Sequence, residues 1–232
     1  MTKTGILILV IAAVAAVLLY LRTRTTGLPE SHAPISRLAL PKPDPARLEI
    51  RGFEFYVRLD PARSGESLQA LATAVGNRGT IYPRSQWAMV LWDDFFAPDA
   101  LLREISDSLA TQVIWLSFQK QVDAFELQHW AKGQLQRRLM FGCYEKERTW
   151  EKVEGQPEAW EAAALFDPRD LQREIEFLKD YPPQGKTLVA AEAELRAIWS
   201  EHRLSVDSQL PNITGRDAAE AVAVAYSLPG WE

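Results

Sequence analysis

Cysteine is almost absent from this chain, because Cys143 is the only one among its 232 residues. A single thiol cannot form an intramolecular disulfide, and it cannot build a thiolate metal cluster. Histidine is also scarce: the chain has three, far apart, and none has a partner four residues away. The sequence therefore predicts no metal site and no cofactor. Stability must come from packing, for which 47% hydrophobic residues and eight tryptophans provide ample apolar surface.

Motifs of common catalytic sites are missing as well. No Gly-x-Ser-x-Gly sequence occurs, so the nucleophile elbow of many hydrolases is excluded. Gly185-Lys186-Thr187 is like the end of a phosphate-binding loop, but Asp180 stands where that loop needs a glycine. Cys143 lies in a strand-like segment, which is more typical of a small buried hydrophobic residue than of a nucleophile.

Basic residues become the minority after residue 47. Residues 1–47 hold six basic and two acidic side chains, whereas the remainder holds 20 basic and 29 acidic ones. A domain with a net charge of −9 repels phosphate backbones. The sequence therefore predicts no nucleic-acid partner.

The only long apolar run is at the N-terminus, where residues 5–21 read GILILVIAAVAAVLLYL. As a helix it would span roughly 26 Å, close to the hydrocarbon core of a bilayer. The alternative is a cleaved signal peptide, but the small-x-small site Ala13-Val14-Ala15 lies inside the run. We therefore expect residues 1–24 to be a single transmembrane anchor that contacts the lipid bilayer through residues 5–21.

The flanks of this run predict the location of the rest of the chain. Arg22, Arg24 and Arg37 follow the run, whereas Lys3 and the terminal amine precede it. The more basic flank normally stays inside. We expect a single-pass protein of the cell membrane with its domain on the cytoplasmic side.

A proline-rich segment separates the apolar run from the domain. Five prolines occur between residues 28 and 47, and proline this dense prevents helix and favours an extended conformation. Residues 25–47 are thus expected to form a tether; for their second half, a loop on the domain surface is the alternative. The domain is expected to occupy residues 48–232.

Residue periodicity within the domain predicts strands and helices. Apolar and alternating segments predict strands over 48–59, 86–92, 113–118, 122–130 and 134–144, the last two joined by a hairpin turn at Gly133. Helical spacing predicts helices over 67–75, after Pro98, and three times after Asp167. The predicted fold class is α+β: a single N-terminal transmembrane helix, then an antiparallel-rich sheet with packed helices and a helical portion over 167–232.

Asp93 and Asp94 are the candidate catalytic residues. They follow an apolar strand and precede Phe95-Phe96, so one carboxyl group could be partly buried with a raised pKa, as in acid/base catalysis. The alternative is an ordinary strand-to-helix turn, which we favour.

Candidate binding residues lie in the segment 144–161, YEKERTWEKVEGQPEAWE. Tryptophans flanked by charge are typical of recognition surfaces, so the sequence predicts a protein-binding surface made by Trp150, Trp160, Glu154 and Glu158. The alternative is that both tryptophans belong to the core and the glutamates only face solvent.

Residues 112–161 also contain two spaced patterns. The first is W-x-x-G-x-x-x-R, from Trp130 to Arg137, and the second is W-x-x-V-E-G-x-P-x-x-W-E, from Trp150 to Glu161. In these patterns the segment resembles uncharacterised bacterial proteins. The resemblance implies no activity and no functional residue.

The sequence therefore favours a membrane-tethered protein-interaction module, or an accessory subunit of a membrane complex, with a protein partner. The alternative function is a membrane-anchored hydrolase that uses carboxylates such as Asp93 or Asp94.

Overall fold

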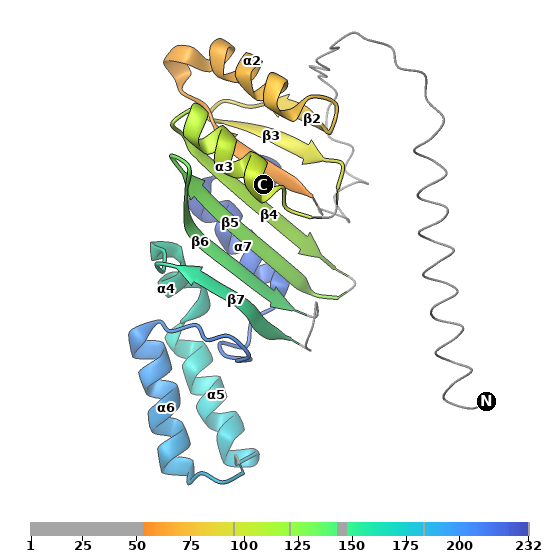
Figure 1. Cartoon of the computed structure of the whole chain (residues 1–232). Coiled ribbons are helices and arrows are strands. Elements are labelled where there is room, and N and C mark those ends of the chain that lie inside the picture. Colours follow the sequence, from red (N-terminus) through yellow and green to blue (C-terminus); the bar gives the residue numbers. More distant parts are fainter. Residues whose placement is uncertain (1–52, 95, 121, 143–147, 183, 232) are drawn as a thin grey trace, which may run out of the picture. The chain divides into compact units, whose positions relative to one another are not determined.

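A computed structural model of the chain describes residues 53–94, 96–120, 122–142, 148–182 and 184–231. Seven strands form one sheet in the order β2-β3-β1-β4-β5-β6-β7, and every neighbouring pair is antiparallel (Figure 1). The strands are β1 (Glu54–Arg58), β2 (Gly79–Pro83), β3 (Trp87–Trp92), β4 (Gln112–Gln119), β5 (Ala124–Ala131), β6 (Gln134–Gly142) and β7 (Thr149–Gly155).

The helices cover both faces of the sheet. They are α2 (Ser64–Val75), α3 (Asp99–Ser108), α4 (Ala159–Leu165), α5 (Pro168–Asp180), α6 (Leu188–Glu201) and α7 (Gly215–Tyr226). Helices α2 and α3 lie in front of the sheet in Figure 1, and α7 lies behind it. The described residues thus form an α+β domain.

Alternation along the central strand β4 divides the core into two layers. Val113 and Trp115 pack with α2 and α3, whereas Ile114 and Leu116 pack with α7 and the other C-terminal helices. All four side chains are fully buried. A strand that is apolar on both faces reads as a continuous hydrophobic run, and the expectation of a central strand over 113–118 is confirmed.

The hairpin between β5 and β6 turns where the sequence predicts it. Lys132 and Gly133 both have positive φ, of 49° and 74°, which is the backbone of a two-residue type I′ turn. A Cβ atom at Gly133 would also lie 3.0 Å from the side chain of Asp107, which would then have to shift slightly.

Side-chain caps begin the three helices of the C-terminal portion. The side chains of Asp167, Thr187 and Thr214 accept hydrogen bonds from backbone N–H groups in the first turns of α5, α6 and α7. The three predicted helices after Asp167 are confirmed. The indole of Trp231 donates to the hydroxyl of Tyr56 at 2.9 Å, which fixes the C-terminal segment against β1.

Two strands and one helix escape the sequence prediction. Strand β2 is a short edge strand that ends at Pro83, and edge positions tolerate proline. Strand β7 and helix α4 flank the segment 156–158; charged residues interrupt the alternation of β7, and α4, with seven residues, is too short to show a helical period.

The predicted fold class needs one correction, which concerns the membrane-spanning helix. No helix in the described part of the chain is both long and apolar enough to cross a membrane. The apolar run 5–21 that motivated the expectation lies outside the described residues, as do the proposed boundaries at residues 24 and 47.

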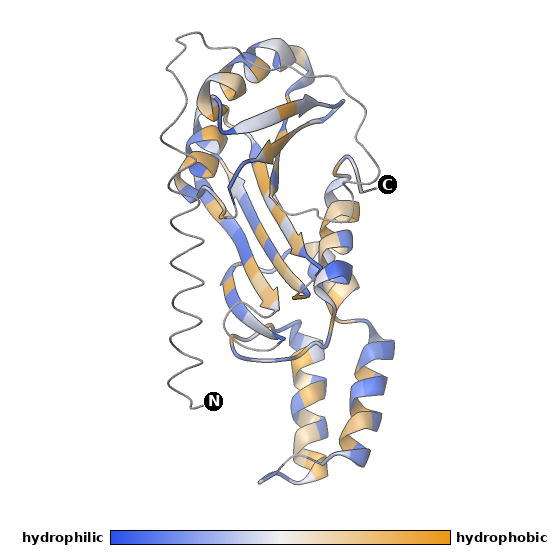
Figure 2. Cartoon of the chain, turned by 90° about the vertical axis from the view of Figure 1, so that its right-hand side faces the viewer, coloured by the Kyte–Doolittle hydropathy of each residue, from blue (hydrophilic) through white to orange (hydrophobic). Residues whose placement is uncertain are grey.

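Helices α5 and α6 form an antiparallel hairpin that extends past the β7 edge of the sheet (Figures 1 and 2). Its base is joined to the core through Ile175, Leu195 and Trp199, which belong to the same hydrophobic cluster as the residues under α7. Its free end consists of the last turn of α5, the connecting loop and the first turn of α6.

Candidate functional site

The candidate catalytic pair lies in a surface turn. Asp93 and Asp94 follow the last residue of β3, and both are exposed. The backbone N–H of Asp93 donates to the carbonyl of Arg78 at 3.1 Å, so the turn is tied to the start of β2. This arrangement matches the ordinary turn, because exposed carboxyl groups lack the desolvation that an acid/base residue needs.

The four candidate binding residues do not share one surface. Trp150 is fully buried and its ring lies 5.0 Å from that of Phe141, while Trp160 is 9% exposed in the same cluster. Glu158 is largely enclosed, and only Glu154, on β7, is exposed. The structure therefore places the two tryptophans in the core, as the alternative interpretation of this segment has it.

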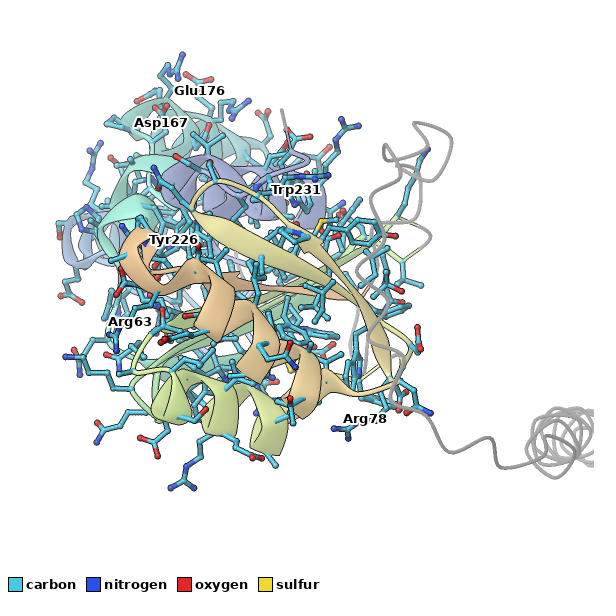
Figure 3. The ribbon with its side chains drawn as sticks, turned by 90° about the horizontal axis from the view of Figure 1, so that it is seen from above. Arg63, Arg78, Asp167, Glu176, Tyr226 and Trp231 are labelled. Atoms are coloured by element: carbon cyan, nitrogen blue, oxygen red, sulfur yellow. The ribbon has the colours of Figure 1, made fainter. Side chains whose placement is uncertain are left out.

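Glu158 is the centre of a buried polar cluster. Its Oε1 lies 2.5 Å from Nδ1 of His129, and its Oε2 accepts bonds of 2.6 Å from the Tyr226 hydroxyl and from the Trp160 indole. The cluster thus joins β5, the start of α4 and the end of α7. Tyr226, which Figure 3 labels, also accepts a bond of 3.1 Å at its backbone carbonyl from the Trp87 indole on β3.

Burial and hydrogen bonding act in opposite directions on Glu158. Burial raises the pKa of this carboxyl group, but the bonds from His129, Tyr226 and Trp160 outweigh it and hold the pKa below its ordinary value. Burial first, and then the Glu158 carboxylate, raise the pKa of the Tyr226 phenol. The hydrogen bonds donated to Glu158 therefore stabilise the ionised form of its carboxyl group.

A histidine held at Nδ1 by a carboxylate has the geometry of a general base. In His129, however, the other ring nitrogen, Nε2, is buried and has no hydrogen-bond partner within the described part of the chain. A base must reach the proton that it abstracts, and an enclosed nitrogen cannot present itself to a substrate from solvent. The cluster is suited to holding three elements together.

A second buried contact joins β6 to α4. The guanidinium of Arg137 binds the Glu161 carboxylate at both oxygens, at 2.8 and 2.6 Å, and the exposed fractions of the two side chains are 2% and 0%. Arg137 also donates to the carbonyls of Glu154 and Gly155. The Glu161 carboxylate also accepts a hydrogen bond of 2.8 Å from the backbone N–H of Glu158, as part of a capping box at the start of α4.

These contacts explain the spaced patterns physically. In the first pattern Gly133 makes the turn and Arg137 supplies the guanidinium; in the second, Glu161 supplies its carboxylate. Gly155 has φ of +82°, and a Cβ atom there would lie 2.0 Å from the carbonyl oxygen of Gln136. Arg137, Gly155 and Glu161 therefore stabilise the junction of β6, β7 and α4.

The described residues offer no candidate metal site. Among the residues with described positions, no group of three His, Cys, Asp or Glu side chains could hold a metal ion. Cys143 lies outside those residues.

An exposed apolar surface lies at the free end of the α5–α6 hairpin, which we call the hairpin tip. It comprises Phe177 on α5, Tyr181 at the C-cap of α5, and Leu188 and Val189 on α6, with exposed fractions of 57%, 65%, 38% and 80%. The rings of Phe177 and Tyr181 stack with centroids 4.7 Å apart. Every described residue from 179 to 190 is exposed, so the tip projects into solvent.

Helical spacing could have indicated the hairpin tip from the sequence. The buried stripe of α6 contains Ala191, Leu195 and Trp199, and Val189, two residues before Ala191, lies about 200° from it around the helix. In α5 the only buried residue is Ile175, and Phe177 lies about 200° from it around the helix. Large apolar residues outside a core stripe are the signal that the sequence offers for this surface.

Acidic side chains surround the hairpin tip. Residues 174–194 hold five carboxylates and two lysines. Lys186 is paired with Glu194 at 2.5 Å, and Glu192 is paired with Arg196. Within the described residues, no ion pair engages the other three carboxylates, which are Glu174, Glu176 and Asp180.

Comparison with known proteins identifies no relative. No family model, no curated protein and no solved structure matches this chain.

Proposed function

We propose that the domain is a protein-interaction module that binds a protein partner through the hairpin tip. The observation that carries the proposal is the cluster of four exposed apolar side chains, including a stacked aromatic pair, on a projecting helical hairpin. Isolated exposed apolar residues are ordinary, but a cluster of them is typical of interaction sites. We therefore expect the tip of the hairpin to bind the partner and its base to stabilise the fold.

Aromatic side chains on a helical scaffold are suited to this role. Tyrosine and other aromatic residues are enriched among the few residues that dominate binding energy. They cost little conformational entropy to order, and here the stacking of Phe177 on Tyr181 already restricts both rings. Trp150 and Trp160, the tryptophans of the predicted binding surface, would support such a site only through the stability of the domain, because both are in the core.

Site-specific photo-crosslinking in cells tests the proposal. A photoreactive amino acid replaces Phe177 in one variant, and replaces Val224 in the control. Val224 is an exposed residue, 75% accessible, on α7. We expect a discrete crosslinked protein adduct from position 177 and none from position 224.

The binding energy is tested with the partner captured in this way. Phe177→Ser should weaken its association by about 2 kcal/mol or more, which is roughly a 30-fold increase in Kd. Val224→Ser should leave the Kd unchanged, and both variants should keep the melting temperature of the wild type because both side chains are exposed. Equal crosslinking at the two positions, or none at either, would contradict the proposal.

The proposal concerns the domain alone. The cell-membrane location and the bilayer contact expected from residues 5–21 stay predictions, because those residues lie outside the described part of the chain. No observation favours the alternative hydrolase, since Asp93 and Asp94 are exposed in a turn.

A further inference from the structure

We infer that the partner presents a basic amphipathic helix to the hairpin tip, an inference that rests on the proposed function. Three carboxylates beside the apolar side chains have no cation within ion-pair distance among the described residues, and they are Glu174, Glu176 and Asp180. A partner with lysine or arginine next to leucine-like residues would complement both properties of this surface.

The spacing of residues on α5 places charge and aromatic surface side by side. Glu174 and Phe177 are at positions i and i+3 and so share one side of the helix, and Tyr181, the C-cap residue of α5, stacks on Phe177. Asp180 is three residues beyond Phe177 and borders the same aromatic pair. Glu176 lies at the margin of the domain in Figure 3, where it is open to a partner. An apolar centre with a charged border is the general layout of a protein interface.

Partial desolvation adds to the case for a cation at Glu174. Burial raises the pKa of this carboxyl group, against the effect of Arg173 and with a contribution from Asp170. A cation brought beside Glu174 would favour its ionised form, which the free protein disfavours.

The same charges disfavour two other classes of partner. Anionic lipid headgroups and nucleic-acid phosphates would be repelled by the three carboxylates at the tip that no described ion pair engages. A helix with acidic flanks would be repelled likewise. Amphipathic helices engage a partner through apolar residues at i, i+3, i+4 and i+7, and complementary charges across the interface fix the register.

The test measures binding of synthetic helical peptides to the full-length protein by fluorescence anisotropy. One labelled 18-residue peptide has leucine at amphipathic spacing and lysine elsewhere; its matched control has glutamate in place of lysine. We expect the Kd of the lysine peptide to be at least tenfold lower than that of the glutamate peptide, and to rise steeply with added salt.

Two matched double variants locate the effect. Glu176→Gln/Asp180→Asn removes two exposed carboxylates at the tip, and should raise the Kd of the lysine peptide at least fivefold. Glu66→Gln/Glu104→Gln removes two exposed carboxylates from α2 and α3, and should change the Kd less than twofold. Equal effects of the two variants would show general attraction to an acidic protein and would overturn the inference.

The remaining outcomes separate the inference from the proposed function. If position 177 crosslinks to a partner but the lysine peptide binds no tighter than the glutamate peptide, the partner is not basic and only the inference fails. If position 177 gives no adduct and Phe177→Ser leaves peptide binding unchanged, both fail. Co-sedimentation with phosphatidylcholine or phosphatidylserine vesicles that depends on Phe177 would overturn both in favour of a lipid surface.

Discussion

Loss of the Arg137 guanidinium is expected to destabilise the domain severely. In the folded protein Arg137 binds both oxygens of the Glu161 carboxylate, and neither side chain has appreciable access to water. Arg137→Met keeps most of the volume of the side chain but leaves the carboxylate buried without its counter-ion. Removing one partner of a buried pair costs about 3–5 kcal/mol, which is a melting-temperature decrease of roughly 6–20 °C for a domain of this size.

The double variant Arg137→Met/Glu161→Met should be more stable than Arg137→Met. Replacing a buried ion pair by apolar side chains is often neutral or stabilising. Here the N–H of Glu158 and the carbonyls of Glu154 and Gly155 also lose hydrogen bonds, so a net cost of about 1–3 kcal/mol remains. The order of stability is therefore wild type, then the double variant, then Arg137→Met.

Urea unfolding followed by tryptophan fluorescence gives the free energy of unfolding of the wild type, Arg137→Met, Glu161→Met and the double variant. The fluorescence reports on this region because Trp150 and Trp160 belong to the same core. The coupling energy between the two positions should exceed about 1 kcal/mol, as for residues in direct contact. Additive costs, or a loss below about 1 kcal/mol for Arg137→Met, would refute the argument that this pair holds α4 on the sheet.

Two other predictions concern the same junction. Trp150→Ala should reduce the free energy of unfolding by about 3–5 kcal/mol, because the side chain is fully buried. Glu154→Ala, on the exposed part of β7, should change the free energy of unfolding by about 0.5 kcal/mol or less. A similar effect of both substitutions in urea unfolding would refute the core placement of Trp150. The pKa of Glu158 is lowered by folding, so its contribution to stability is present above the ordinary carboxyl pKa and is lost as pH falls through the lowered one. Melting temperatures measured from about pH 7 to pH 3 should therefore fall less steeply for Glu158→Gln than for the wild type, and parallel curves would contradict this.

Local backbone chemistry explains which parts of the fold were predictable from the sequence. Gly133 in the hairpin turn and the caps Asp167, Thr187 and Thr214 act on their immediate neighbours, so their types alone identify the elements. The central strand over 113–118 was equally clear, since burial on both faces leaves an uninterrupted apolar run.

Long-range partners explain where the sequence failed. The segment 144–161 has the composition of an exposed surface, but Arg137 neutralises Glu161, and Glu158 is solvated by side chains from three different elements. Apart from Trp160, those partners are between 24 and 68 residues away along the chain, so no local window contains them. Charge on this segment therefore predicted exposure for Trp150 and Trp160, whereas tertiary pairing allowed their burial.

The attachment of the hairpin to the core is what makes its tip suited to binding. Side-chain contacts hold its base: Trp199 on α6 donates to the carbonyl of Asp167 at 3.1 Å and meets Phe166 edge to face at 5.8 Å, while Ile175 and Leu195 extend the core into the hairpin. A fixed base presents the tip in one orientation, so a partner pays less conformational entropy on binding than it would with a loose helical extension. Trp199→Ala should therefore weaken partner binding without touching the tip.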